Sequence, residues 1–430
     1  MKSIANNRKF LIPLVLVTSL FFLWGIANSL NGTLIKHFQT ALDLNRAQAG
    51  IIDSAFYIGY FIMALPAGFF IKKLGYKKGI LIGLLLYATG AFLFYPAAEF
   101  RVYGFFLFAL FVIACGLAFL ETAANPYVTI LGDQQSAEKR INLAQSFNGL
   151  SIILGPVIGG LFIFSKDEYT NASLNAMPIG QAKAIRVAEA HSVQIPYLII
   201  GSVVLLVALL ITLTKMPDIE SSSDDRSSIK KIIHHKHLVK GIIAQFFYVG
   251  AQASLWGYYV DLKLHFAKAE NISSVEWLYR MDSTMTATQM ASFHASFALV
   301  LFMIGRFVGT WLLTIVESNK LLAFYSASCV GLMVIAWLSS GLTSLLAITI
   351  TYFFMSIMFP TIFALSIRNL GSQLKLGSAL VIMAIVGGAV LPPLAGLMSG
   401  YGMQHALIVP LISFIIIFYF GWRGYKPLTV

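Results

Sequence analysis

Charged side chains are scarce in this chain of 430 residues, since Asp, Glu, Lys and Arg make up only 11% of it. A soluble domain carries about 25%. There are only two cysteines, Cys115 and Cys329, and both lie in apolar runs where they act most simply as small packing residues, so we expect no disulfide. The HExxH, GxSxG, Walker A and paired-cysteine patterns are absent as well. An enzyme therefore has little support, and we expect no cofactor.

What the chain has instead is long apolar runs: 58% of its residues are hydrophobic and its mean hydropathy is +0.79. Each run is close to the roughly 20 residues that a helix rising about 1.5 Å per residue needs to cross a bilayer. We therefore predict an all-α membrane protein with twelve transmembrane helices. They lie near residues 11–35, 47–71, 79–98, 103–131, 141–165, 194–214, 239–262, 289–316, 321–340, 344–367, 377–399 and 404–422.

The net charge of +12 could suggest nucleic acid, but the basic residues are distributed by side of the membrane. If the N-terminus is cytoplasmic, most of the 30 Lys and Arg fall in cytoplasmic segments, as the positive-inside rule requires. We predict an integral protein of the cell (inner) membrane, with both termini cytoplasmic and no nucleic-acid partner. The first apolar run has full length and no convincing cleavage site, so no signal peptide is expected.

Landmarks of the first half of the chain recur in the second half, about 234 residues later. The tripeptide LWG occurs at 23–25 and at 255–257, Pro126 is matched by Pro360, and Gly155-Pro156 by Pro392-Pro393. These pairs predict a duplicated unit: an N-terminal six-helix bundle over 1–214, a cytoplasmic linker over 215–237, and a C-terminal six-helix bundle over 238–430. Such repeats are typical of transporters that rock two bundles around a midplane site.

The loop after the second apolar run reads GFFIKKLGYKKG and resembles the signature of the major facilitator superfamily in this loop. In that signature, glycines such as Gly68 and Gly75 allow a tight turn, and bases such as Lys77 anchor it at the inner face. The loop departs from the signature at Lys72, where an acid is usual. The resemblance implies the major facilitator fold, with two pseudo-symmetric six-helix bundles.

Five longer stretches carry a more specific resemblance: LETAANPYV at 120–128, NLAQSFN at 142–148, AQFFYVGAQASLWGYY at 244–259, GRFVGTWL at 305–312 and FPTIFALSIRNLG at 359–371. Together they resemble one family in particular, the fucose:proton symporters of that superfamily. The resemblance implies inward transport of a hexose or deoxyhexose together with a coupling cation. We expect a functional monomer whose partners are the sugar, the cation and the lipid bilayer.

Polar side chains in the apolar runs are candidates for sugar recognition, because a sugar site sets polar groups and aromatic faces in a pre-formed cleft. By resemblance, Gln145 and Asn148 are the amides that bind the sugar hydroxyls. The residues that complete the predicted sugar-binding set are Asn28, Ser29, Asn31, Gln252, Trp256 and Tyr259. The alternatives are hydrogen bonding between helices for the amides and plain packing for the tryptophan.

Glu121 lies in the apolar run 103–131, five residues before Pro126. An ionised carboxylate in hydrocarbon costs roughly 2.5 to 3.5 kcal/mol, so something must compensate for it. By resemblance, the acid at this place couples cation movement to sugar movement, since a carboxyl group in a cavity that loses and regains water can take up and release a proton. The competing interpretation is a fixed ion pair, for which Arg306 is the one obvious base within a helix.

One departure from the family pattern leaves the coupling ion open. The family carries an aspartate after the asparagine of the first helix, where this chain has Asn31-Gly32, and more usually a glutamine where this chain has Asp53. Two carboxylates, Asp53 and Glu121, would suit a bound Na⁺, whereas a single titrating carboxylate suits H⁺. We favour H⁺ slightly. Asp53 can also be read as a solvated residue near the end of its helix.

A second class of function stays open at this point. The stretch SIILGPVIGG at 151–160 partly resembles the Gly-Pro-rich signature of exporting antiporters, with Ser151 where a glycine is typical. Efflux of sugars or drugs is therefore an alternative to import. The polar set favours a hydroxylated cargo, and the Gly and Pro residues can simply bend and closely pack a moving helix. Which sugar is carried cannot be read from these residues, because epimers differ only in the direction of one hydroxyl.

Overall fold

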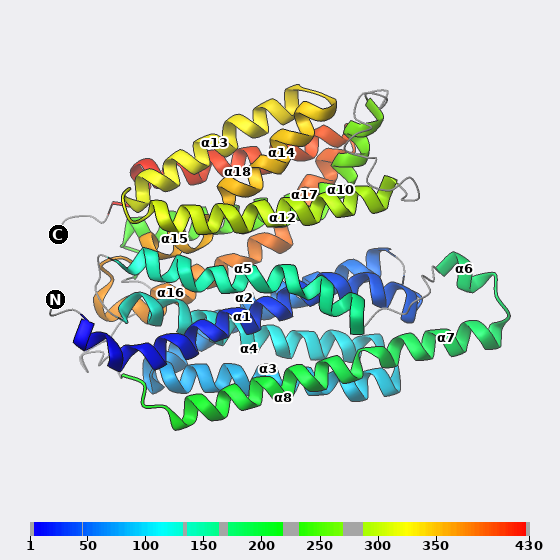
Figure 1. The fold of residues 1–430 in the computed structure, drawn as a ribbon, viewed down its shortest axis with the longest axis horizontal. Coiled ribbons are helices and arrows are strands. Elements are labelled where there is room, and N and C mark those ends of the chain that lie inside the picture. Colours follow the sequence, from blue (N-terminus) through cyan, green and yellow to red (C-terminus); the bar gives the residue numbers. More distant parts are fainter. Residues whose placement is uncertain are drawn as a thin grey trace. The chain divides into compact units, whose positions relative to one another are not determined.

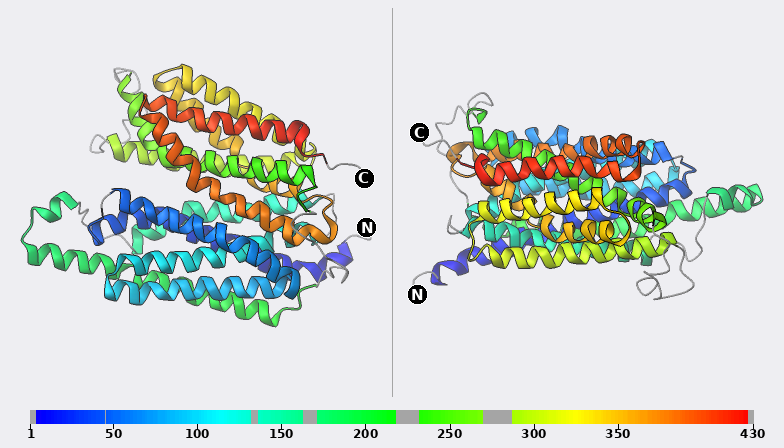
Figure 2. Two further views of the ribbon diagram at one scale, coloured as in Figure 1. Left: turned by 180° about the vertical axis from the view of Figure 1, so that it is seen from behind. Right: turned by 90° about the horizontal axis from the view of Figure 1, so that it is seen from above.

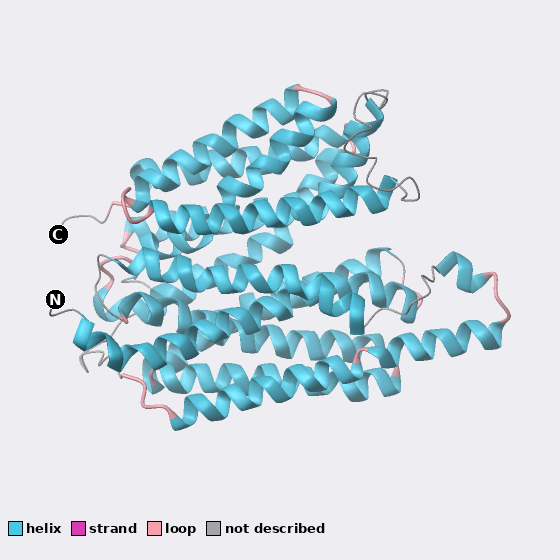
Figure 3. Ribbon diagram, viewed as in Figure 1, coloured by secondary structure: helices cyan, strands magenta, loops and turns pink. Residues whose placement is uncertain are grey.

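The computed structural model describes residues 4–44, 46–131, 136–162, 171–217, 232–269 and 287–426. Within these ranges the chain is helical and contains no strand (Figure 3). It divides into two compact units, each of which is described by itself below. Unit 1 comprises residues 1–134, 147–225 and 378–383, and unit 2 comprises residues 135–146, 226–377 and 384–430. Helix α5 (Ala137–Phe162) contributes its first turns to unit 2 and the remainder to unit 1.

Unit 1 is a bundle of long helices (Figures 1 and 2). Helices α3, α4 and α8 run side by side in Figure 1, and α7 continues past the end of α3 toward the short α6. Besides the second part of α5, the helices are α1 (Ile4–Ala41), α2 (Arg46–Leu74), α3 (Tyr76–Phe100), α4 (Tyr103–Ile130), α6 (Asn171–Asn175), α7 (Ile179–Ser192) and α8 (Gln194–Leu213).

Small residues bring the helices of unit 1 close together, which is how helices pack where lipid supplies no hydrophobic driving force. A Cβ added at Gly116 of α4 would stand 2.6 Å from the carbonyl oxygen of Gly83 on α3. Aromatic rings fill the remaining space, and the rings of Phe94 and Tyr197 stack with centroids 3.7 Å apart. Large apolar side chains such as Phe61 and Leu206 are exposed, as expected of a lipid-facing surface.

The α2–α3 turn confirms what the signature loop implied about its glycine. Gly75 adopts a φ of 84°, a left-handed conformation that side chains other than glycine rarely tolerate. After the turn, the Lys77 ammonium donates to the carbonyl oxygens of Thr212 and Thr214, at 2.9 Å each. These carbonyls lie at the C-terminal end of α8, where the backbone lacks intrahelical donors and a cation is favoured. The lysine therefore anchors α8 to the loop.

Unit 2 is built from helices that are interrupted more often, such as α14 and α15 (Figure 1). Two of its spans consist of consecutive segments: α14 is followed by α15, and α16 leads through a 3-10 turn at 384–386 into α17. The elements outside α5 are α10 (Lys236–Ala269), α12 (Ala287–Leu312), α13 (Ser318–Leu338), α14 (Gly341–Met355), α15 (Met358–Ser366), α16 (Leu374–Met383, of which 378–383 are grouped with unit 1), α17 (Gly387–Ser399) and α18 (Ile408–Tyr419).

The break between α14 and α15 has an identifiable cause in Pro360. A proline has no backbone N–H, so Pro360 cannot donate to the carbonyl of Ser356, four residues earlier. Ser356 and Ile357 leave the helix, and α15 starts again at Met358. The carbonyl of Ser356 then needs another donor, because an unpaired carbonyl in a membrane interior is costly.

Eleven of the described helical segments are long and apolar enough to span a membrane. They correspond in order to eleven of the twelve predicted helices, and α5 corresponds to the twelfth, the predicted run at 141–165. One candidate span is longer than predicted: α7 precedes α8 with only Val193 between them, so the apolar stretch runs from Ile179 to Leu213 instead of beginning at residue 194.

Candidate functional site

Glu121 has its partner within unit 1, and that partner is a tyrosine. The Glu121 side chain, 4% exposed, accepts a hydrogen bond of 2.7 Å at Oε1 from the hydroxyl of Tyr60 on α2. The same hydroxyl is hydrogen-bonded to the side chain of Asn28 on α1. Side chains from three helices, with Tyr60 and Glu121 buried and Asn28 partly buried, therefore form one polar cluster, Asn28–Tyr60–Glu121. A strong donor at the carboxylate is the kind of compensation that a buried acid requires.

The structure gives Glu121 and Arg306 different partners. Tyr60 holds the carboxylate in unit 1, whereas the Arg306 guanidinium donates to two backbone carbonyls in unit 2. The interpretation of these two residues as a fixed ion pair stays a prediction that these contacts do not test. Within unit 1, Glu121 has the surroundings of a carboxyl group that can exist with or without a proton, since a phenol can hydrogen-bond to either form.

The second part of α5 packs against α1 through the predicted sugar residues Asn148 and Ser29. The Asn148 amide donates to the carbonyl of Phe21 at 3.3 Å, and Ser29 Oγ donates to the carbonyl of Ile152 at 3.0 Å. Both bonds join helices, as expected under the interhelical interpretation, although Asn148 is only partly buried and its side-chain oxygen has further acceptor capacity. The hydroxyl proton of Ser29 is used in its hydrogen bond to the carbonyl of Ile152.

Gly25 permits this approach of α1 to α5. A Cβ added there would lie 2.7 Å from the carbonyl oxygen of Asn148 and 1.8 Å from Ser151 Oγ. At Gly257, its counterpart in the repeat, nothing lies within 4 Å of an added Cβ. We expect Gly25→Ala to lower the free energy of unfolding by about 1 to 3 kcal/mol, because α1 and α5 must separate. Gly257→Ala is the matched control and should leave stability unchanged or slightly raised. Thermal unfolding of the two purified variants measures this, and equal effects would contradict it.

Gln145 lies on the part of α5 that is grouped with unit 2, and its side chain is 3% exposed. Its backbone carbonyl accepts a hydrogen bond of 2.6 Å from Nη1 of Arg306 on α12. Nε of the same guanidinium donates to the carbonyl of Ser356 at 2.9 Å. The ring of Phe302 lies below the guanidinium, 4.6 Å from Cζ to the ring centroid. A predicted sugar residue is thus tied to the helix break that Pro360 creates.

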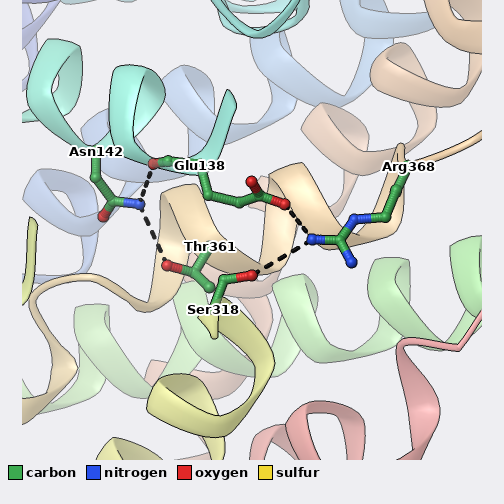
Figure 4. Close-up of polar contacts among 5 residues, drawn as sticks. All are labelled: Glu138, Asn142, Ser318, Thr361 and Arg368. Atoms are coloured by element: carbon green, nitrogen blue, oxygen red, sulfur yellow. Dashed lines mark hydrogen bonds and ion pairs between the residues drawn. The ribbon is translucent and has the colours of Figure 1, made fainter. Parts of the chain in front are cut away.

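Two further residues of α5, closer to its N-terminus, also bond to residues of unit 2, in their case through their side chains (Figure 4). The Asn142 amide donates to Thr361 Oγ1 at 3.3 Å, and the Glu138 carboxylate pairs with the Arg368 guanidinium, which also reaches Ser318 Oγ. Glu138, Asn142 and Gln145 stand at i, i+4 and i+7, which places them on one helix face. Along this face the first half of α5 is bonded to α12 through Gln145 and to α15 through Asn142, and Glu138 pairs with Arg368, which follows α15.

Helix α10 carries the predicted residues Gln252, Trp256 and Tyr259. The Tyr259 hydroxyl is hydrogen-bonded to Thr349 Oγ1 at 2.8 Å, and its ring packs edge-on against Tyr352, so this residue has the contacts of a packing residue. Trp256 packs edge-on against Phe302, and its indole N–H has no partner in the described part of the chain although it is buried. Gln252 is partly buried.

Three predicted features fall outside what is described at side-chain level. The side chains of Asp53 in α2 and Asn31 in α1 belong to this group, so the predicted two-carboxylate site for Na⁺ lies outside the described side chains. The Gly-Pro part of the export-like stretch, residues 155–160, belongs to it as well. A cavity of about 590 Å³ at the end of unit 1, lined by Asp43, Arg101 and Lys183 among others, contains none of the predicted site residues.

Sequence reasoning missed Tyr60, the direct partner of Glu121. It stands in an aromatic run with Phe56 and Tyr57, and nothing in the local pattern distinguishes its hydroxyl from that of Tyr57. The role of Arg306 was also missed, although a signal for it existed. Pro360 lies four residues after Ser356, so a free carbonyl at Ser356 was foreseeable, and a buried arginine is a natural donor for such a group.

Comparison with known proteins places these observations in a family. A sequence model of the Major Facilitator Superfamily matches residues 17–383. The L-fucose-proton symporter of Escherichia coli (strain K12) is 42% identical over 98% of this chain and 94% of its own length. A glucose/galactose transporter of Brucella abortus biovar 1 (strain 9-941) is 35% identical over 98% of this chain and 96% of its own length. A crystal structure of the E. coli fucose:proton symporter, at 41% identity, covers 97% of this chain and 99% of its own with a TM-score of 0.85.

Proposed function

We propose that this protein imports a sugar together with a proton, because the chain belongs to the Major Facilitator Superfamily and, within it, to the fucose:proton symporter family. The family and the fold are therefore those predicted from the sequence, and the protein is an integral membrane transporter rather than an enzyme. The cargo that we propose is a hexose or deoxyhexose, since relatives along nearly the full length are named for fucose and for glucose and galactose.

The observation that carries the proposed coupling is the buried Glu121 carboxylate, held by the Tyr60 hydroxyl in an otherwise apolar helix. A carboxyl group in a membrane interior is expensive to keep, and it is typically retained where a proton or an ion moves. We propose H⁺ rather than Na⁺, because the E. coli relative is named for the proton. A hydrogen-bonded carboxylate also suits proton transfer better than Na⁺ binding, which needs several oxygens converging on one point.

For the sugar we propose Gln145 and Asn148 as the principal amides. Gln252 and Trp256 support them, since the Trp256 indole N–H is a buried donor without a described partner and can donate to a sugar hydroxyl. Asn28 belongs to the Glu121 cluster, and Ser29 and Tyr259 already have partners in the protein. Two six-helix bundles over 1–214 and 238–430, cytoplasmic termini, location in the inner membrane and action as a monomer are part of the same proposal.

The test is uptake into proteoliposomes containing the purified protein. L-Fucose, D-galactose and D-glucose are offered under an inward pH gradient, under an inward Na⁺ gradient, and under neither. We expect one or more of these sugars to accumulate with the pH gradient alone and the accumulation to vanish when a protonophore is added. Accumulation that needs Na⁺ would contradict proton coupling. Counterflow of labelled sugar separates a sugar carrier from a drug exporter, because only the carrier exchanges it.

A further inference from the structure

Arg306 is a buried cation that the proposed mechanism does not use. It lies inside α12 and is 3% exposed. Within the described part of the chain, its guanidinium faces the carbonyl oxygens of Gln145 and Ser356 and the ring of Phe302, and no carboxylate pairs with it. A charge at this depth is seldom retained for stability alone, since keeping it there is expensive.

The chain is arranged locally so that Arg306 reaches these groups. Gly305, the residue before it, lets α12 approach α14 closely, because a Cβ at Gly305 would stand 2.2 Å from the carbonyl oxygen of Phe353. Pro360 frees the carbonyl of Ser356, and Arg306 Nε fills the missing bond at 2.9 Å. The planar guanidinium holds two donors in a fixed relation, so its second donor direction is set once the first bond is made.

The second donor of Arg306, Nη1, points to the carbonyl oxygen of Gln145, which lies 2.6 Å away. A contact to the backbone fixes the position of α5 along its axis and its rotation about that axis at this turn. These two determine the direction in which the Gln145 side-chain amide points. Cζ of the guanidinium lies over the ring of Phe302, and Phe302 packs edge-on against Trp256 with ring centroids 5.8 Å apart. One side chain thus contacts the backbone of one proposed sugar residue and, through one ring, the side chain of another.

We propose that Arg306 is a positioning residue for sugar recognition: by bridging the carbonyls of Ser356 and Gln145, it holds Gln145 at the position from which its amide binds the sugar. This inference rests on the proposed function. It adds that the helix break at Ser356 determines sugar affinity through Arg306, and that Arg306 does so without touching the sugar.

A double-mutant cycle tests this, with binding of L-fucose and of D-galactose to purified protein measured by calorimetry. Arg306→Lys keeps the charge but cannot hold two carbonyls in a fixed fork, and we expect it to weaken binding about tenfold. Added to Gln145→Ala, it should weaken binding further by no more than about twofold, because a residue that acts through Gln145 has nothing left to position. Arg306→Gln, which loses the charge, should bind no more tightly than Arg306→Lys.

Tyr248→Phe is the matched control. The Tyr248 hydroxyl donates at 3.1 Å to the carbonyl of Met355, next to Ser356 in the same break, but it makes no bond to Gln145. This variant should lower the thermal unfolding temperature while sugar affinity stays within about twofold of the parent. An equal loss of affinity in Tyr248→Phe would overturn the proposal, because the effect would then come from the break as a whole.

Other outcomes separate this inference from the proposed function. If Gln145→Ala weakens sugar binding and folded Arg306→Lys does not, or if the two effects add fully, the positioning role is overturned and the sugar site stands. If Gln145→Ala binds both sugars as the parent does, the proposed sugar site falls and the positioning role falls with it. Should Arg306→Lys not fold, Pro360→Ala serves instead: its restored N–H competes for the carbonyl of Ser356, so it should loosen Arg306 and weaken binding severalfold. Unchanged affinity there would count against the proposal.

Discussion

Replacing Glu121 by Gln is expected to abolish concentrative sugar uptake, so that the ratio of internal to external sugar under a pH gradient falls to one. The carboxyl group of Glu121 is buried and hydrogen-bonded to Tyr60, and the amide that replaces it can neither gain nor lose a proton. Sugar exchange at equilibrium should persist, since exchange need not move the coupling ion. Uptake and exchange of labelled L-fucose, measured in the same proteoliposomes, show both effects.

Tyr60→Phe is the matched variant for this experiment, because it removes the hydroxyl but keeps the carboxyl group. We expect it to accumulate sugar, although at a lower rate, since the carboxylate has lost its strongest described donor. If Glu121→Gln still accumulates sugar, Glu121 is not the coupling residue. If Glu121→Gln loses both the accumulation of sugar and its exchange, Glu121 has a role in sugar binding or in structure.

Gln145→Ala and Asn148→Ala are each expected to weaken sugar binding by about 1 to 3 kcal/mol, because each deletes a hydrogen bond to a sugar hydroxyl in a closed site. Both amides lie on α5, three residues apart, and each is fixed by a neighbouring helix, Gln145 through Arg306 and Asn148 through the carbonyl of Phe21. Calorimetry with L-fucose and D-galactose on purified protein gives the affinity, and thermal unfolding shows whether the variant is folded.

Asn142→Ala controls for the loss of an amide from the same helix. The Asn142 amide donates to the carbonyl of Glu138 and to Thr361 Oγ1, so its donors are used inside the protein. Its loss should reduce stability by about 1 kcal/mol and leave sugar affinity near that of the parent. Unchanged affinity in both Gln145→Ala and Asn148→Ala would remove these residues from the sugar site, and equal losses in all three variants would indicate a general distortion of α5.

The internal repeat predicted the correspondence of the two halves better than it predicted their local geometry. Gly25 is required where α1 meets α5, whereas nothing lies near Gly257. Pro126 stands inside a continuous α4, whereas Pro360 follows a break. A duplicated landmark preserves the residue type, but the contacts depend on the neighbouring helix, which differs between the halves. For this reason the matched pairs serve as controls for one another.

The sequence by itself determined the class of this protein, the order of its membrane-spanning helices and its family. Run length and composition are enough for the class and the helix order, because a bilayer requires about 20 apolar residues per helix whatever their neighbours are. The family came from the longer stretches that resemble the fucose:proton symporters. It also singled out Glu121 and Arg306, since a charge in an apolar run is conspicuous. Only the tertiary structure decided their partners: Tyr60 for Glu121, and the carbonyls of Gln145 and Ser356 for Arg306. Hydrogen-bond partners depend on how each helix is rotated and how closely it approaches segments up to 161 residues away, and hydropathy carries no information about either.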